Sequence, residues 1–362
     1  ILTERDSKMD ISELLKIHPY SLKKNEKKQL LTDMLKELTI YHYENCKEYR
    51  NILDGVGYDP YVDINNYTEL PMLPVRIFKE LDLKSVPNEE LKKRMQSSGS
   101  TGQKVSRLYL DRRTALAQQN VGIKITSGFL GIKRMPLIII DSPSVVKSRE
   151  AYTARGAAAL FFSLFGSDRI FALDEDMNLD VDKLKSFLKK HEDKQILVFG
   201  FTYMVWQHLI CVLREQGLRM DFHDGILIHS GGWKKMESIK VSMSEFKGEL
   251  ADLCNIGQVY NEYGMAEQSG TIYFECEHGN YHASIFSDII VRRTRDLSIC
   301  DYGEQGLLEL FSVLPHSYPG HVLLTEDEGV ICGEDDCPCG RLGKYFHVKG
   351  RIKNAELRGC SD

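Results

Sequence analysis

The chain alternates between segments with two different spacings of hydrophobic residues. Residues 27–46, KKQLLTDMLKELTIYHYENC, carry apolar side chains three and four positions apart, which predicts an amphipathic helix packed on a core. Residues 134–141 (RMPLIIID) and 194–201 (KQILVFGF) are short apolar runs, as expected for strands buried on both faces of a sheet. This pattern predicts helices and buried strands in turn.

The order of these elements indicates an α/β fold. Another buried strand is expected at residues 225–232, and Asp111 stands where a helix cap is expected. Strands and helices that take turns along a chain are typical of a largely parallel, doubly wound sheet. The remaining helices are expected at residues 111–125, 151–166, 202–217 and 242–254.

The pattern changes near Ile272, after which alternating strands are interrupted by Gly and Pro. This change predicts a small β-rich subdomain. We therefore expect an α/β nucleotide- and acyl-binding core at residues 1–271, the β-rich subdomain at 272–350, and a hinge and tail at 351–362.

Composition narrows the class of protein. The net charge of −5 argues against a nucleic-acid-binding protein, which usually has a basic face. No apolar run reaches the roughly 18 residues of a membrane span, and the polar first residues lack the apolar core of a signal peptide. A cytoplasmic protein is expected, in which the nine cysteines are thiols or metal ligands rather than disulfides.

Residues 96–111, QSSGSTGQKVSRLYLD, combine glycines, hydroxyl side chains and one lysine. Backbone N–H groups, hydroxyls and an ammonium suit a polyphosphate, so this segment is a candidate phosphate-binding loop. A strand-like pattern rather than a helix follows it, so it is not a Walker A loop. A flexible Ser/Gly turn in a hairpin is the alternative, which the segment alone does not exclude.

Two further glycine-bearing turns follow expected strands. They are HSGGWKK at residues 229–235 and YNEYGMAEQSG at residues 260–270. Ligands of open α/β sheets gather at the carboxyl ends of strands, although YGMAE alone could be an ordinary helix entry.

The set SSGSTGQK, SGG, YGMAE, TED and GR occurs in the order found in adenylate-forming enzymes, which join a carboxylate to ATP to make acyl-AMP. Within that superfamily the chain most resembles the acyl-protein synthetases of bacterial bioluminescence, the LuxE family, and then the arylacetate-CoA ligases. LPVRIFK at residues 73–79, the Trp-Lys after SGG and the terminal RGC carry this resemblance. It implies the N-terminal domain of an adenylate-forming enzyme, with the usual C-terminal cap domain absent or truncated.

The resemblance also implies roles for individual residues. Lys104 would bind the phosphates and Glu267 would hold Mg²⁺. Tyr263 would stack on adenine, Asp327 would accept hydrogen bonds from the ribose, and Arg351 would lie near ribose and phosphate. The implied nucleotide-binding residues are Ser98, Gly99, Ser100, Thr101, Gly102, Ser230, Gly231, Gly232, Tyr263, Gly264, Asp327 and Arg351.

Two departures from the family pattern occur, since no proline precedes Lys104 and Glu326 replaces the glycine before the aspartate. The segment NAELRGCSD places Cys360 where the acyl-protein synthetases carry the cysteine that accepts the acyl group. The resemblance therefore implies a thioester on Cys360 and an acyl-reductase or acyl-carrier partner protein. An inert tail cysteine is the alternative.

The other cysteines gather in two clusters. FECEHGNYH and ICGEDDCPCGR together offer the soft ligands of a tetrahedral Zn²⁺ site. We expect four ligands and a structural role, with His278 and Cys332 in reserve and unmetallated thiols as the alternative. The expected ligands are Cys276, His282, Cys337 and Cys339.

The first functional hypothesis is an enzyme that uses ATP and Mg²⁺ to activate a fatty acid or other carboxylate and passes the acyl group through a cysteine to a partner protein. An acyl- or aryl-CoA ligase without its C-terminal domain and a non-catalytic, zinc-containing nucleotide-binding module are the alternatives. Phe199, Phe201, Met204 and Trp206 could line an acyl pocket, but a buried strand and helix explain them equally, and we favour core.

Overall fold

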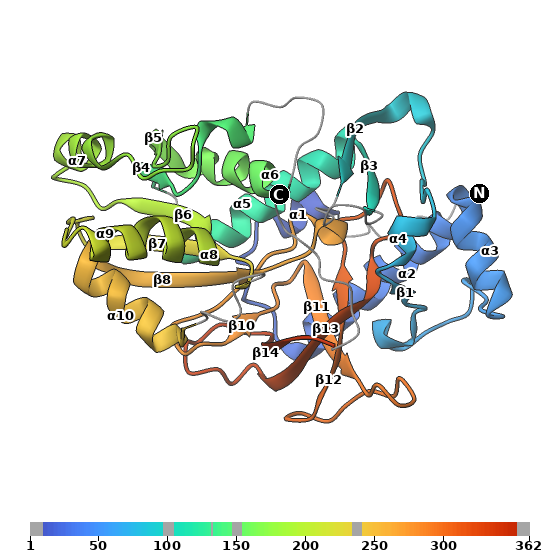
Figure 1. The fold of residues 1–362 in the computed structure, drawn as a ribbon. Coiled ribbons are helices and arrows are strands. Elements are labelled where there is room, and N and C mark those ends of the chain that lie inside the picture. The colour runs from blue at the N-terminus through green and yellow to red at the C-terminus, as the bar shows by residue number, and fades with distance from the viewer. Residues whose placement is uncertain (1–9, 97–104, 132, 147–153, 234–240, 353–362) are drawn as a thin grey trace. The chain divides into compact units, whose positions relative to one another are not determined.

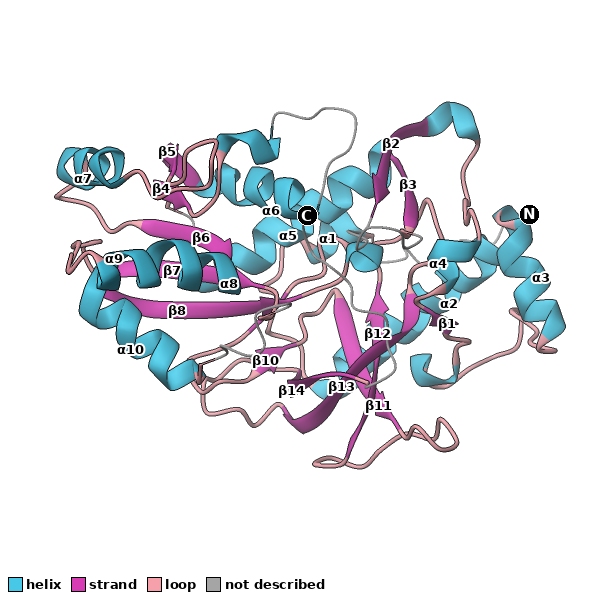
Figure 2. Ribbon diagram, in the orientation of Figure 1, coloured by secondary structure: helices cyan, strands magenta, loops and turns pink. Residues whose placement is uncertain are grey.

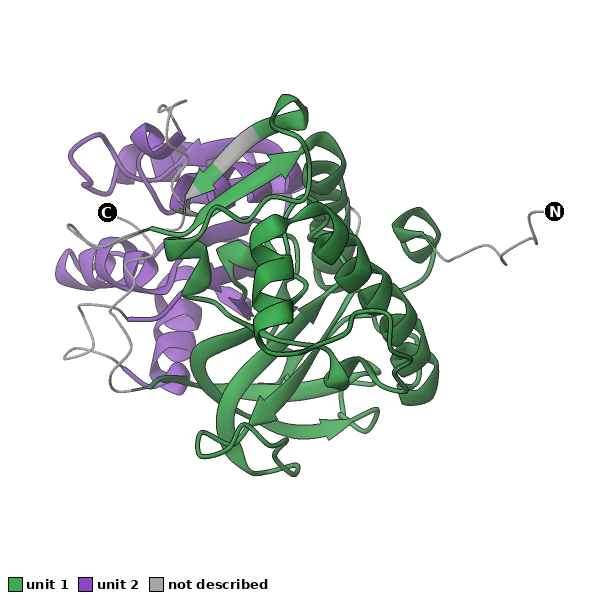
Figure 3. Cartoon of the chain, turned by 90° about the vertical axis from the view of Figure 1, so that its right-hand side faces the viewer, with its two compact units in different colours: residues 1–95, 104–131, 264–356 green, residues 96–103, 132–263, 357–362 purple. Residues whose placement is uncertain are grey.

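The structure is a computed structural model that describes residues 10–96, 105–131, 133–146, 154–233 and 241–352 (Figure 1). The chain divides into two compact units (Figure 3). Unit 1 comprises residues 1–95, 104–131 and 264–356, and unit 2 comprises residues 96–103, 132–263 and 357–362.

Unit 2 is built on a parallel sheet in which the strand order is β5-β4-β6-β7-β8. β4 and β6 are buried along their whole length, as their apolar runs predict for strands covered on both faces. The strands are β4 (Met135–Ile139), β5 (Gly166–Phe171), β6 (Leu197–Phe201), β7 (Gly225–Ser230) and β8 (Ile256–Tyr263).

The helices of unit 2 alternate with these strands, as expected (Figure 2). They are η3 (Pro143–Val146), α6 (Ala154–Phe162), η4 (Ser163–Phe165), α7 (Val181–Lys190), α8 (Thr202–Val205), η5 (Trp206–Ile210), α9 (Cys211–Glu215) and α10 (Met243–Cys254). The helix expected from Thr202 onward is interrupted by η5, which is a π-helical turn. β5 and α7 lie outside the expected pattern.

Unit 1 contains an antiparallel sheet with the strand order β10-β14-β13-β12-β11, and β1 pairs with β13 in parallel. All strands of this sheet except β1 follow Ile272, where the sequence pattern changes. Its strands are β1 (Leu73–Pro74), β10 (Tyr281–His282), β11 (Ser287–Arg292), β12 (Gln305–Ser312), β13 (Val322–Glu334) and β14 (Lys344–Arg351). The short β9 (Tyr273–Phe274) also lies in unit 1 but is not part of this sheet.

A two-stranded ribbon flanks the candidate phosphate loop. β2 (Leu91–Gln96) precedes the loop and β3 (Arg107–Asp111) follows it, as the alternating pattern predicts. At the end of β3, the Asp111 carboxylate accepts a hydrogen bond from the Thr114 N–H at 2.7 Å and so caps the next helix. The expected cap is therefore confirmed.

The helices of unit 1 lie within residues 11–90, 112–130 and 266–268 of the chain. They are α1 (Ile11–Leu14), α2 (Lys24–Asn45), α3 (Lys47–Gly55), η1 (Tyr67–Glu69), α4 (Ile77–Glu80), η2 (Asn88–Glu90), α5 (Arg112–Leu130) and η7 (Ala266–Gln268). In α2 the residues Leu30, Leu31 and Leu35 are buried, which confirms the expected amphipathic helix.

One hydrophobic core joins the early and late segments of unit 1. Tyr49 and Leu53 of α3 and Phe78 of α4 pack in the same cluster as Tyr318 and Leu323. Residues more than 200 positions apart in the sequence therefore share one core.

No helix in the described part of the chain is long and apolar enough to cross a membrane.

Candidate functional site

The residues expected to contact adenine begin at the carboxyl end of β7 in unit 2. Ser230 ends the strand, and Gly231 follows with a φ of 71°, a conformation that favours glycine. The Thr202 hydroxyl donates to the Gly231 carbonyl at 2.7 Å and lies 2.8 Å from Nδ1 of His229. Burial lowers the pKa of His229 to about 3, so the ring is neutral and Nδ1 can donate to Thr202. These contacts hold the turn in one conformation.

The next strand of the sheet ends beside this turn. Ser230 of β7 pairs in register with Glu262 of β8, and Tyr263 is the last residue of β8. Burial raises the pKa of Glu262 to about 7, although a hydrogen bond from Ser230 opposes the shift. Sequence reasoning finds Ser230 and Tyr263 but misses Thr202 and Glu262, because only the strand pairing brings them to the turn.

In unit 1, the predicted Mg²⁺ ligand Glu267 lies on the single 3₁₀ turn η7. Its side chain is buried, with 1% of its surface exposed. The turn packs closely on the chain around it, since a Cβ atom on Gly264 would lie 3.3 Å from the Thr271 carbonyl oxygen. The backbone around Glu267 is therefore tightly held.

Asp327 and Arg351 lie opposite each other on β13 and β14. Nε of Arg351 is 3.3 Å from Oδ1 of Asp327, so the structure brings these two predicted residues together. The neighbouring Glu326, which replaces the family glycine, forms an ion pair with Arg76. A carboxylate beside a guanidinium can accept from a diol while the cation retains donors for an anion.

Several predicted residues lie outside the described part of the chain. These are the phosphate-loop residues Ser98, Gly99, Ser100, Thr101, Gly102 and Lys104, and the candidate acyl acceptor Cys360. The other nucleotide residues are divided between the two units, because the boundary falls between Tyr263 and Gly264.

The four expected metal ligands converge in unit 1, and we call Cys276, His282, Cys337 and Cys339 the cysteine–histidine cluster. Their ligand atoms all lie within 4.8 Å of one another. Sγ of Cys276 is 4.0 Å from Sγ of Cys337, and Sγ of Cys339 is 3.2 Å from Nε2 of His282. Two thiolates bound to one tetrahedral zinc ion lie roughly 3.8 Å apart, so the geometry fits zinc. His278 and Cys332 are not part of this cluster.

Burial sets the protonation of the cluster in the absence of a metal. Burial raises the pKa of Cys276 to about 12 and lowers the pKa of His282 to about 4. These shifts keep the Cys276 thiol and the His282 imidazole uncharged. A divalent metal would displace the thiol protons and favour thiolates.

Hydrogen bonds around the cluster orient its sulfur atoms. Nδ2 of Asn280 donates to Sγ of Cys337 at 3.4 Å, and Oδ1 of Asn280 lies 2.9 Å from Nε2 of His347. The Arg341 side chain hydrogen-bonds to Cys339 and pairs with Glu277 at 3.1 Å. Such outer contacts usually fix the geometry of metal ligands.

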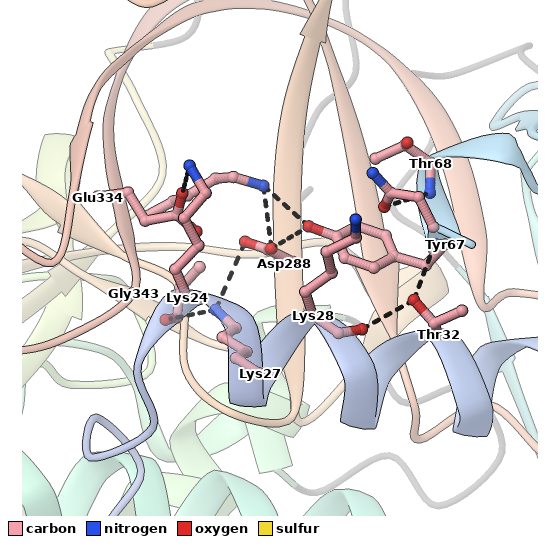
Figure 4. Close-up of polar contacts among 12 residues, drawn as sticks. Lys24, Lys27, Lys28, Thr32, Tyr67, Thr68, Asp288, Glu334 and Gly343 are labelled. Carbon is pink, nitrogen blue, oxygen red and sulfur yellow. Dashed lines mark hydrogen bonds and ion pairs between the residues drawn. The ribbon is translucent and has the colours of Figure 1, made fainter.

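A second group of polar side chains is buried in unit 1, and we call Lys27, Tyr67, Asp288 and Lys344 the lysine–aspartate cluster. Figure 4 labels Lys27, Tyr67 and Asp288 of this cluster. Nζ of Lys344 lies 3.0 Å from Oδ2 of Asp288 and 2.9 Å from the Tyr67 hydroxyl. Nζ of Lys27 is 3.4 Å from Oδ1 of Asp288, and the Tyr67 hydroxyl also donates to Asp288. Burial alone would raise the pKa of Asp288, but Lys27 and Lys344 lower it to about 2. Sequence reasoning misses this cluster.

The candidate acyl-pocket residues form core instead. Phe199, Phe201, Met204 and Trp206 are each 5% exposed or less, and the ring of Phe199 stacks on Phe162 at 4.2 Å. This agrees with the interpretation favoured from the sequence.

Comparison with known proteins decides the family. The family model described as "Acyl-protein synthetase, LuxE" matches residues 4–362. The chain belongs to the LuxE family. Two relatives of this LuxE chain are long-chain-fatty-acid–luciferin-component ligases. The Vibrio harveyi protein is 26% identical over 345 residues, covering 93% of this chain and 87% of the relative. The Aliivibrio fischeri protein is 25% identical over 348 residues, covering 93% and 88%.

Solved structures show what fold this LuxE chain shares. A 2-hydroxyisobutyryl-CoA ligase in an open conformation, with 2-HIB-AMP and CoA, has a TM-score of 0.71 at 17% identity and covers 93% of this chain and 77% of that chain. The same ligase in a postadenylation state has a TM-score of 0.69 at 18% identity and covers 92% and 69%. The LuxE chain therefore has the fold of an adenylate-forming ligase, which confirms the expected fold class.

Proposed function

We propose that this chain is an ATP-dependent acyl-protein synthetase that activates a long-chain fatty acid and transfers the acyl group to a thiol. The observation that carries the proposal is the match of the LuxE model to residues 4–362, a range that includes every expected site residue. The names of the two relatives support a fatty acid as the carboxylate. We expect the reaction to take place in the cytoplasm, where ATP and reduced thiols are available.

The proposed first step joins two anions. A carboxylate oxygen of the fatty acid attacks the α-phosphorus of ATP, the bond to the β-phosphate breaks, and pyrophosphate leaves. Lys104 and the loop from Ser98 to Gly102 would hold the phosphates, and Glu267 would hold Mg²⁺. Bound Mg²⁺ supplies positive charge that offsets the repulsion between the anions. The residues would neutralise negative charge and hold the reactants in position, because this step requires no proton transfer.

The remaining nucleotide contacts would position the reacting phosphate. The rigid Ser230–Gly232 turn and the Tyr263 ring would bind adenine, and Asp327 with Arg351 would bind the ribose. The hydrogen bonds of Thr202 support the first role, because a fixed turn loses little conformational freedom on binding. The ion pair of Asp327 with Arg351 supports the second.

The proposed second step forms a thioester. The Cys360 thiolate attacks the acyl carbonyl of acyl-AMP, and the bond to the phosphate oxygen breaks as AMP leaves. A partner nucleophile, such as an acyl reductase or acyl-carrier protein, then takes the acyl group from sulfur. A CoA ligase is the second candidate, favoured by the fold shared with 2-hydroxyisobutyryl-CoA ligase.

We also propose that the cysteine–histidine cluster holds one structural zinc ion. Cys276, His282, Cys337 and Cys339 would complete its coordination, which leaves no position for substrate. The ion would stabilise the chain between β9 and β14 without taking part in the chemistry.

Pyrophosphate exchange with fatty acids tests the first step. We expect Lys104→Ala and Glu267→Gln each to lower the exchange rate by at least about tenfold, because both remove groups that stabilise transition-state charge. Lys92→Ala and Glu89→Gln, two exposed positions before the loop, are the matched controls. Unchanged exchange in Lys104→Ala and Glu267→Gln would exclude the nucleotide assignment, and no exchange by the parent protein would favour a non-catalytic module.

Labelled fatty acid tests the second step. We expect Cys360→Ser to retain pyrophosphate exchange and to lose the hydroxylamine-labile acyl group on the protein, because serine is a much weaker nucleophile at neutral pH. Cys211→Ser, at a partly exposed cysteine of α9, is the control. Equal labelling of Cys360→Ser and the parent would exclude Cys360 as the acceptor, and transfer to free CoA would favour the ligase.

A further inference from the structure

Within unit 1, the segment Ser317–Gly320 contacts the strand and helix that follow the phosphate loop. Oγ of Ser317 donates to the Tyr109 carbonyl of β3 at 2.7 Å. The N–H of Ser317 donates to Oγ1 of Thr114, in the first turn of α5, at 3.0 Å. The segment is therefore bonded to both elements that continue the chain from the loop of Lys104.

The same segment contacts the turn that carries Glu267. The Tyr318 hydroxyl donates to the backbone carbonyl of Glu267 at 3.0 Å and accepts from Nε2 of Gln118 of α5 at 3.2 Å. Tyr318 is fully buried and Gln118 is 6% exposed, so water does not readily replace either bond. A single hydroxyl thus links α5 to the Glu267 backbone.

Close packing leaves this arrangement little freedom. A Cβ atom on Gly320 would lie 2.8 Å from the Glu267 carbonyl oxygen and 2.5 Å from Cε2 of Tyr318. The Gly320 carbonyl accepts from Nε2 of Gln268, the residue after Glu267, at 2.9 Å. Position 320 therefore requires glycine. The turn η7 is held through the backbone carbonyl of Glu267 and through the side chain of Gln268.

We infer that Ser317–Gly320 is a positioning segment, in which Tyr318 sets the position of Glu267 relative to the strand and helix that follow the phosphate loop. This inference rests on the proposed function, in which Glu267 holds the metal and the loop holds the phosphates. Tyr318 acts through Glu267 and needs no contact with substrate. Its loss would weaken metal binding, because a carboxylate whose backbone can shift holds a cation less well.

Metal binding can be measured without turnover. Mn²⁺ serves as the probe for the Mg²⁺ site, and its binding to the full chain with a non-hydrolysable ATP analogue is followed by electron paramagnetic resonance. We expect Tyr318→Phe to raise the Mn²⁺ dissociation constant about tenfold and to raise the Mg²⁺ concentration that half-saturates pyrophosphate exchange by a similar factor. The KM for the fatty acid should not change.

Tyr273→Phe is the matched control. Tyr273 is a buried tyrosine of the same unit whose hydroxyl lies 3.5 Å from the Asp288 carbonyl, remote in sequence from the segment. It should reproduce any loss of thermal stability that follows from removing a buried hydroxyl, without the change in Mn²⁺ affinity. A parent protein that binds Mn²⁺ with nucleotide and a Tyr318→Phe variant that binds it equally well would overturn the inference alone. A parent protein that binds neither Mn²⁺ nor the ATP analogue would overturn the proposed function as well.

A double variant separates positioning from general destabilisation. In this inference Gln118 acts only through its hydrogen bond to the Tyr318 hydroxyl. Gln118→Met should therefore weaken Mn²⁺ binding by less than Tyr318→Phe does. Adding it to Tyr318→Phe should weaken binding no further. Independent, additive losses in the double variant would contradict the proposed order of contacts.

Discussion

The two polar clusters buried in unit 1 differ in how their polar atoms are compensated. In the lysine–aspartate cluster two lysine ammonium groups share the carboxylate of Asp288, so each cation has an anionic partner within hydrogen-bonding distance. The cysteine–histidine cluster brings three sulfurs and an imidazole together, groups that act mainly as metal ligands. The lysine–aspartate cluster can form without a bound ion, whereas the cysteine–histidine cluster is expected to need a metal for its stability.

The two clusters adjoin each other where β10, which carries His282, pairs with β14, which carries Lys344. His282 of the cysteine–histidine cluster precedes Ala283, whose carbonyl accepts a hydrogen bond from Lys27 at 3.1 Å. The N–H of Ala283 in turn donates to the carbonyl of Lys344 at 3.0 Å. Their difference therefore lies in side-chain chemistry rather than in location, and four experiments test it.

The largest effect is expected from metal removal. Protein purified without added zinc should contain about one Zn²⁺ per chain, and chelation or Cys337→Ser or Cys339→Ser should remove it together with much thermal stability. The reason is that apparent zinc-binding free energies at structural sites are on the order of 10 kcal/mol. Metal analysis and thermal unfolding measure both quantities, with Cys211→Ser as the control. A metal content near zero in a fully stable protein would show that the cysteine–histidine cluster, like the lysine–aspartate cluster, needs no metal.

The next largest effect is expected from Asp288→Asn. This change leaves two buried ammonium groups without their anion, and breaking a buried ion pair in this way typically costs about 3–5 kcal/mol. Denaturant unfolding measures the loss, and zinc content should stay at the parent value. Asp63→Asn, at an exposed carboxylate paired with Lys36 at 2.7 Å, should leave stability unchanged. Equal stability of Asp288→Asn and the parent would show that the carboxylate of Asp288 does not stabilise the two buried lysines.

Acid should separate the two clusters. The pKa of Asp288 in the folded chain is about 2, below its ordinary value of 3.8, so its contribution is fully present above about pH 4 and is lost as pH falls toward 2. Zinc should dissociate at a higher pH, since thiolates and imidazole then take up protons. The difference in unfolding free energy between the parent and Asp288→Asn, measured against pH, isolates Asp288. A difference that already vanished near pH 6 would contradict the assignment.

The smallest effect is expected from Asn280→Ala. The amide of Asn280 orients Cys337 without binding the metal, so its loss should weaken zinc affinity by about 10–100-fold and leave the stoichiometry unchanged. Competition with a chelating dye measures the affinity. Asn88→Ala, at an exposed asparagine bonded to Lys84, is the control, and identical affinities in all three proteins would exclude a role for Asn280.

Local pattern predicted much of the fold. The apolar runs of β4 and β6, the amphipathic α2 and the Asp111 cap of α5 are all confirmed, because each depends on residues close in sequence. The parallel pairing of β1 with β13 was not predictable in this way. Two residues of a short strand carry too little pattern to name a partner about 250 positions away.

The residues of the candidate site also fall into those that local sequence predicts and those that it does not. Residue type and spacing pointed to Cys276, His282, Cys337 and Cys339, because few side chains bind zinc and these occur in two tight groups. No such signal marks Thr202, Gln118 or Tyr318. The hydroxyls of Thr202 and Tyr318 donate to distant backbone carbonyls, and Gln118 donates to the Tyr318 hydroxyl, so their importance comes from contacts between residues far apart in the sequence.

The sequence by itself therefore determined the alternation of strands and helices, the family and the chemistry that the chain can offer. Only the tertiary structure decided which groups meet: that Lys27 and Lys344 share Asp288, and that Tyr318 bonds to Glu267. The physical reason is that hydrophobic periodicity and capping act over a few residues, whereas a buried ion pair or hydrogen bond forms wherever packing brings its two partners together.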